Sequence, residues 1–268
     1  MHELTNRTTW TAGLFPGFDP QGHRGITLVV KCSHALDSTG RLRALLPSEP
    51  LVLTDTRDIP HPGLELCRPS EIVPFKAQAE FLLHGSPGRG RGLDITLWRD
   101  GHRLWGKHFR ERTQAITLRP GKDAAGLPSH RARLLKGLNP APDRIHSPPI
   151  QGTLPLHCHQ AAPPDQRLPG PFTGGERLQL KARGARRDER HLNLILPSTD
   201  PVQAWAIGNG QRERLHLTCD TLILDLVTRR VHRLFRACLP QGRTDNAGWI
   251  IVRHRDEQDN IVPGDNDP

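Results

Sequence analysis

The sequence predicts an all-β fold, mainly antiparallel, in a sandwich or barrel-like arrangement with at most one or two short helices. Apolar and polar residues alternate over many short segments, which is the period of a strand with one buried face. The 268 residues include 25 glycines and 25 prolines, a content that favours short elements joined by turns. The longest apolar runs, such as 26–30 and 222–227, have the length of strands.

The first clear strand covers residues 25–36. Ile26, Leu28, Val30 and Cys32 fall on one face of it because they are two residues apart. The polar segment 37–40 contains Asp, Ser, Thr and Gly, which are typical of a turn. We therefore expect the chain to return as a second strand over 41–46.

Segment 74–84 predicts a half-buried strand. Its small and apolar residues share one face and its polar residues share the other, with Leu82 as the exception. A β-hairpin follows over 93–109, where Asp100-Gly101 separates two apolar-rich arms. An Asp-Gly pair in this position is the strongest short hairpin signal in the chain.

Segment 120–151 is rich in proline and glycine and is either a linker or a long crossing loop. One short helix is expected in it, with Ser129 as the N-cap. Two arrangements stay open. One is a single β-rich domain over 1–254, and the other is a pair of packed β subdomains, 1–119 and 152–254.

Strand patterns resume after this segment, and the last of them ends before an acidic tail at 255–268. We expect the tail to be disordered, since it is rich in acidic residues and has few apolar residues to bury. A hairpin is expected where 222–226 and 231–237 pair around 227–230. The other expected strands are 153–157, 176–182, 191–196, 202–207, 214–219 and 249–252.

The chain is strongly basic, because 31 Arg and 6 Lys outnumber 28 Asp and Glu and give a formal net charge of +9. The acidic tail has a net charge of −4, so residues 1–254 carry +13. A basic body suggests an acidic partner, either nucleic acid or an acidic protein surface. An arginine-rich composition spread over a solvated surface is the simpler interpretation.

The compartment follows from cysteine usage and from the apolar runs. Five cysteines, an odd number without a CxxC pair, argue against a disulfide framework. No run is long enough to span a bilayer, and the N-terminus lacks a basic segment followed by an apolar one. We expect a cytoplasmic protein without a membrane partner.

A metal site is the first chemical hypothesis, because His157 and His159 flank Cys158. On a strand the two imidazoles point the same way, and this spacing can chelate zinc. No HxxxH or CxxC supplies further ligands, and no GxSxG elbow marks a nucleophile. We therefore predict no catalytic residue, metal or cofactor, and keep a metal-dependent hydrolase as the second alternative function.

Nucleic-acid binding is the first alternative function. Segments 181–190 and 229–236 hold five and four Lys or Arg residues, and neutralising phosphates requires clusters of this kind. Aromatic residues make up only 4% of the chain, although single-strand binders use them as stacking platforms. Solvated basic hairpins explain both segments equally well.

Several segments together resemble one family. It is a family of unknown function that is encoded beside type VI secretion spike, PAAR-like and pentapeptide-repeat proteins. The residues that carry the resemblance best are Val30-Lys31, Pro74-Phe75-Lys76 and a corner at 157–166. In this corner two prolines and Asp165 fix a turn, and Gly175-Glu176 follows it in the chain. Segment 120–150 departs from the family, because it is shorter and lacks an aromatic-Glu-Arg stretch and a Gly-Gly pair. The similar segments are 17–37, 70–86, 95–107, 160–180 and 219–240.

The resemblance implies a non-enzymatic adaptor or chaperone that binds a secreted effector (a toxin) and loads it onto the spike. Its expected partners are the effector and a spike or PAAR-like protein. Family-typical positions are the candidate binding residues, although the same residues can equally serve the fold. They are Lys31, Lys76, Asp165, Gln166, Glu176 and Arg236.

Overall fold

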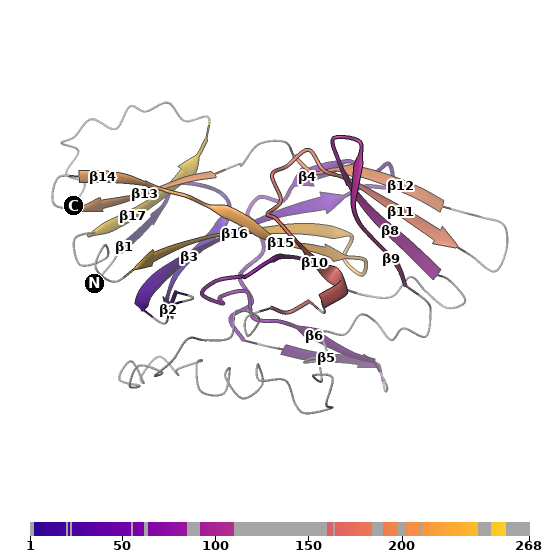
Figure 1. Ribbon diagram of the computed structural model, residues 1–268, viewed down its shortest axis with the longest axis horizontal. Helices are drawn as coiled ribbons and strands as arrows, with labels where there is room; N and C mark the ends of the chain where they lie inside the picture. Colours follow the sequence, from indigo (N-terminus) through magenta and orange to yellow (C-terminus); the bar gives the residue numbers. More distant parts are fainter. Residues whose placement is uncertain are drawn as a thin grey trace.

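The computed structural model shows a β-rich molecule built from open sheets (Figure 1). Within the described residues, the regular structure consists of strands and one short 3-10 turn, Pro164–Gln166. The all-β, mainly antiparallel prediction is confirmed, and sheet-on-sheet packing fits the sandwich alternative. The structure describes residues 3–19, 21, 23–54, 56–61, 64–84, 92–109, 160–162, 164–183, 190–197, 202–208, 211–240 and 248–255.

A seven-stranded central sheet forms the middle of the molecule. Six of its strands follow the order β10-β7-β15-β16-β3-β2, and the seventh, β4, also pairs with β3. Only β7 and β15 run parallel in it. The strands are β2 (Thr11–Phe18), β3 (Arg24–Leu36), β4 (Leu42–Ala44), β7 (Ala79–His84), β10 (Arg167–Leu168), β15 (Thr218–Asp225) and β16 (Arg230–Pro240).

Two four-stranded sheets flank the central sheet at opposite ends of the view in Figure 1. The terminal sheet, at the left, has the order β1 (Glu3–Asn6), β17 (Trp249–His254), β13 (Val202–Gly208), β14 (Gln211–Leu215). The hairpin sheet, at the right, has the order β12 (Arg190–Ile195), β11 (Arg177–Arg183), β8 (Gly92–Arg99), β9 (His102–Phe109). A separate pair, β5 (Thr56–His61) and β6 (Leu64–Arg68), completes the strands.

Strands that are distant in the chain lie side by side in each of the three large sheets. Strands from 1–119 pair with strands from 152–254 in every one of them, for example β3 with β16 and β8 with β11. One apolar cluster joins the three sheets through residues such as Leu28, Ile95 and Val252. The sheets therefore share one core.

The central sheet is buried on both faces. Leu28, Val30 and Cys32 lie in the main core as expected, while Val29 and Leu82 belong to a second apolar cluster on the other face. The prediction of a half-buried strand over 74–84 is wrong in two respects. Strand β7 begins only at Ala79, and its polar-looking face is covered as well, because chain segments without regular structure pack over it.

Most of the other predicted strands are confirmed, with bounds that differ by at most four residues. Segment 214–219 is an exception, because it contains the end of β14 and the start of β15, separated at 216–217. Strands β1, β2, β5, β6 and β10 were not predicted from the sequence. The expected strand 153–157 and the helix starting at Ser129 lie outside the described residues.

Two glycines with positive φ lie in the turns of the β3–β4 and β8–β9 hairpins, and they make a matched pair of tests. Gly40 (φ +90°) contacts β12, because a Cβ there would lie 2.1 Å from the carbonyl oxygen of Asn193. Gly101 (φ +77°) follows Asp100 (φ +50°) in the predicted Asp-Gly turn and would meet no atom within 4 Å.

We expect Gly40→Ala to lower the free energy of unfolding by about 2 kcal/mol, because it adds a backbone clash to the conformational cost. Gly101→Ala is expected to cost about 1 kcal/mol through conformation alone. Urea denaturation of both variants measures the difference. Equal losses would show that the contact between Gly40 and β12 does not constrain the turn.

Candidate functional site

Lys31, the first of the six candidate residues, lies in a buried ion pair. Its Nζ donates to both carboxylate oxygens of Glu71, at 2.8 and 3.0 Å, and to the carbonyl oxygen of Pro50 at 3.1 Å. Glu71 also accepts a bond from the backbone N–H of Val52. The pair thereby ties two chain segments without regular structure to strand β3.

Arg236 performs the same task from strand β16. Its guanidinium pairs with the buried carboxylate of Asp220 and donates to the carbonyl oxygens of Val73 (3.1 Å) and Glu71 (2.7 Å). A planar guanidinium with five N–H groups suits this combination of a carboxylate and two carbonyls. Arg236 thus binds segment 71–73 directly to the central sheet.

Lys76 and Glu80 form a third buried pair, with Nζ and Oε1 2.6 Å apart. The Glu80 carboxylate accepts three more bonds, from the Gln160 side chain (2.9 Å) and from the backbone N–H groups of Ala161 (2.8 Å) and Ala162 (3.0 Å). Burial alone would raise the pKa of Glu80, but Lys76 and these donors together lower it. The three pairs form a buried ion-pair layer that holds segments 50–52, 71–76 and 160–162 on the sheet.

Asp165 and Gln166 lie where the 3-10 turn meets the hairpin sheet. Gln166 is buried, donates to the carbonyl oxygen of Phe81 (3.0 Å) and accepts a bond from Lys107 (3.1 Å). The Asp165 side chain is 62% exposed, although it pairs with Lys107 at 2.6 Å. Its carbonyl oxygen accepts a bond from the indole of Trp105 (2.6 Å). The corner thus fastens β9 to the central sheet.

Glu176 is buried just before β11. It accepts bonds from Arg99 (2.6 Å) and from the backbone N–H of Thr173 (2.8 Å). Burial favours a higher pKa for Glu176, but the bonds from Thr173 and Arg99 outweigh it and lower the pKa. Of the six candidate residues, Asp165 alone offers a well-exposed side chain, and the other five contact groups within the fold.

The basic segment 229–236 does not form a solvated basic surface. His232, Arg233 and Arg236 are buried in strand β16. Both interpretations of this segment, a solvated hairpin and a phosphate-binding cluster, are therefore wrong for these three side chains. Most of the other basic segment, 184–189, lies outside the described residues.

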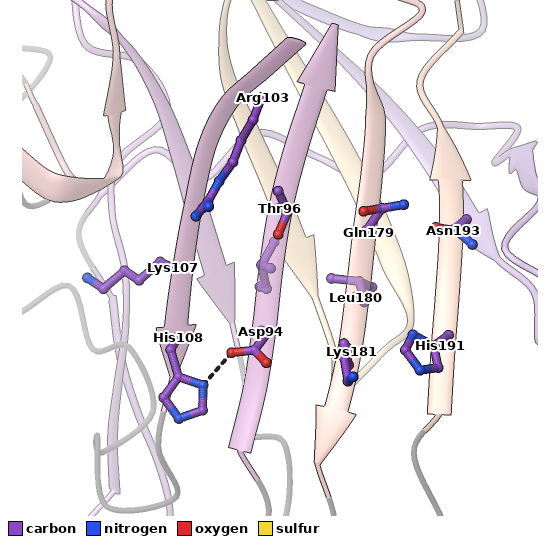
Figure 2. A pocket seen from close by; sticks show the side chains of 12 residues that line it. Asp94, Thr96, Arg103, Lys107, His108, Gln179, Leu180, Lys181, His191 and Asn193 are labelled. Atoms are coloured by element: carbon purple, nitrogen blue, oxygen red, sulfur yellow. Dashed lines mark hydrogen bonds and ion pairs between the residues drawn. The ribbon is translucent and has the colours of Figure 1, made fainter. Parts of the chain in front are cut away.

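A polar groove, missed by the sequence analysis, lies on the outward face of the hairpin sheet (Figure 2). Its volume is about 550 Å³, and it is open to solvent along one side. The strand register places His108, Asp94, Lys181 and His191 in one row across all four strands. A second row holds Thr96, Gln179 and Asn193, and Arg103 lies beside it near the start of β9.

Charges of both signs occur in the groove. The imidazole of His108 pairs with the carboxylate of Asp94, as the dashed line in Figure 2 shows. Lys181 and Arg103 add positive charge, while Gln179 and Asn193 offer amides that both donate and accept. The arrangement suits a ligand that has donors, acceptors and a carboxylate.

The described residues contain no group of three or more His, Cys, Asp or Glu side chains placed to hold a metal ion, and His157, Cys158 and His159 lie outside them. No helix in the described ranges is long and apolar enough to cross a membrane. Cys32, Cys219 and Cys238 form no disulfide among the described residues.

Comparison with known families gives a match over part of the chain. A family model described as "Uncharacterized protein conserved in bacteria (DUF2169)" matches residues 129–236. No curated protein and no solved structure matches the chain. The matched segment includes β11 and β12, which form half of the groove, and the candidate residues Asp165, Gln166, Glu176 and Arg236.

Proposed function

We propose that this protein is a non-enzymatic adaptor that holds a secreted effector and helps to load it onto a type VI secretion spike. The groove on the hairpin sheet carries the binding part of the proposal. The assignment to type VI secretion rests on the resemblance of the sequence segments described above, with the effector and a spike or PAAR-like protein as partners.

The groove suits an extended polypeptide. Four strands spaced about 4.8 Å apart make each row of side chains about 14 Å long, which matches about four residues of an extended chain. The amides of Gln179 and Asn193 can pair with peptide N–H and C=O groups, and Lys181 can meet a carboxylate. An open groove also fits a macromolecule better than a small ligand, which is usually enclosed.

Nucleic acid fits the groove less well. A phosphate backbone would lie against the carboxylate of Asp94, at the centre of the row that contains Lys181 and His191. Phosphate binding gains from uniform positive charge, whereas protein interfaces combine both signs with amides. The mixed lining therefore favours a protein partner over the nucleic-acid alternative.

The test is co-expression of the tagged protein with toxin-like and spike proteins from its own cell, followed by affinity capture with and without nuclease. We expect at least one of these proteins to be captured in stoichiometric amounts, and nuclease to leave the capture unchanged. The variant Gln179→Ser/Lys181→Glu should weaken this binding about tenfold, because it alters both rows of the groove.

Arg177→Glu is the matched control. Arg177 is exposed on the same strand as Lys181 but does not line the groove, so its charge reversal should leave capture unchanged. Capture of nucleic acid alone, lost with nuclease, would overturn the proposal in favour of the nucleic-acid alternative. Stoichiometric zinc that is lost on His157→Ala/His159→Ala would support the hydrolase alternative instead.

A further inference from the structure

The outward face of the terminal sheet combines tryptophan with arginine. Alanine and valine residues of its strands, such as Ala204 and Val252, point into the main core, so their neighbours in the chain point outward. We call this outward surface the Trp/Arg face. It consists of Trp205, Ile207, Arg212, Arg214, Trp249, Ile251 and Arg253.

Two arginines cover Trp205 at the centre of this face. The guanidinium carbons of Arg212, from β14, and Arg253, from β17, lie 4.4 and 4.3 Å from the indole centroid. These are cation–π distances, and the indole is only 7% exposed as a result. The stacking fixes both guanidinium groups on the sheet. Arg253 is buried, whereas Arg212 is exposed, and its fixed position lowers the entropy lost when a partner binds it.

Trp249 gives the face an exposed apolar anchor. Its side chain is 53% exposed, and its indole N–H donates to the carboxylate of Glu3 at 3.0 Å. Half-buried Ile207 lies opposite Trp249 in the register, and Ile251 follows on the same strand. An exposed tryptophan held in one orientation beside arginines has the composition of a binding hot spot.

We propose that the Trp/Arg face docks a protein segment in which Asp and Glu residues surround an apolar side chain. The exposed arginines Arg212 and Arg214, beside the carboxylate of Glu3, make the outer part of the face positive, and charge complementarity calls for an acidic partner. Arg214 lies directly opposite Trp205 and is exposed; it forms no ion pair with any residue in the described ranges.

The chemistry of the face favours protein over nucleic acid. Bases stack on open aromatic rings, but the ring of Trp205 is already covered by guanidinium groups. Trp249 is the one exposed aromatic ring among the described residues of this sheet, whereas proteins that bind single-stranded nucleic acid use several aromatic rings in succession. Figure 1 places the terminal sheet and the hairpin sheet at opposite ends of the molecule. The face and the groove can thus hold two partners at once, which goes beyond the proposed function.

The test places a photo-crosslinking benzophenone amino acid at position 249 in the full-length protein in its own cell. We expect a protein adduct whose crosslinked peptide is rich in Asp and Glu around an apolar residue. The variant Arg212→Glu/Arg214→Glu should lower the adduct yield about tenfold, because both exposed cations become anions. A synthetic copy of that peptide should then bind more weakly as salt rises, and its Asn/Gln version should bind more weakly still.

Matched controls separate this proposal from the alternatives. The same crosslinker at exposed Leu46, on another surface, should not yield the adduct, and Arg43→Glu, an exposed arginine on β4, should leave the yield unchanged. Four outcomes would each overturn the proposal. They are the absence of an adduct at position 249, an adduct that is lost with nuclease, an adduct between copies of this chain, and an adduct yield that does not change when the arginines are replaced. Variants of the groove should leave the adduct yield unchanged. The adduct therefore tests the Trp/Arg face, and the affinity capture tests the proposed function of the groove.

Discussion

Replacing Arg236 with methionine is expected to lower the free energy of unfolding by about 3–5 kcal/mol, the typical cost of removing one partner from a buried ion pair. The substitution leaves the carboxylate of Asp220 buried without its cation. The carbonyl oxygens of Val73 and Glu71 lose their donors as well. Segment 71–73 then loses a direct link to the central sheet. Urea denaturation at neutral pH measures the loss.

Arg230→Met is the matched control for this prediction. Arg230 lies on the same strand and the same face as Arg236, but it is half-exposed and pairs with Glu49 near the surface. Surface ion pairs contribute about 0–1 kcal/mol, so its loss should stay in that range. A similar small loss for Arg236→Met would show that the buried ion-pair layer contributes little net stability. In that case hydrophobic contacts alone would hold the covering segments.

The elements that the sequence predicted correctly are those that depend on neighbouring residues. The Asp100-Gly101 turn and the 222–237 hairpin follow from local alternation and turn chemistry. Strand β1 was missed because it is short and pairs in parallel with β17, almost the whole chain away. Strand β7 was judged half-buried because Glu80 and His84 look like solvent-facing residues. Polar residues in a strand do not show whether other segments cover them.

The candidate site could be predicted only in part, for the same reason. The family resemblance identified the segments that contain Lys31, Lys76, Glu176 and Arg236. It did not identify their ion-pair partners, which lie 16 to 77 positions away in the chain, except that Lys76 pairs with nearby Glu80. The groove was missed because its rows depend on β8 lying beside β11, which brings Asp94 opposite Lys181. Alternation over 93–97 predicts that Asp94 and Thr96 face outward, but not which strand lies next to them.

Replacing Arg233, a third arginine on β16, is expected to have the opposite effect and to stabilise the protein. Arg233 points into the main core between Val231 and Phe235, and only 2% of it is exposed. Its Nη1 donates to the carbonyl oxygen of Pro197 at 3.3 Å, but Nε and Nη2 have no hydrogen-bond partner among the described residues. Burial of a charge without a carboxylate is unfavourable. We therefore expect Arg233→Met to raise the free energy of unfolding by about 1–4 kcal/mol, as replacement of buried charges by apolar residues does.

His34 provides a second measurement on the same variant. Burial, followed by the charge of Arg233, lowers the pKa of His34 from 6.5 to about 4. The unfolded chain therefore binds a proton between these values that the folded chain does not, and stability falls as pH drops below 6.5. Removing the arginine should raise the pKa of His34 in an NMR titration and reduce this loss of stability, whereas Arg230→Met should do neither. A less stable Arg233→Met variant with an unchanged His34 pKa would mean that the guanidinium has a partner outside the described residues, because only a paired charge stabilises the core it occupies.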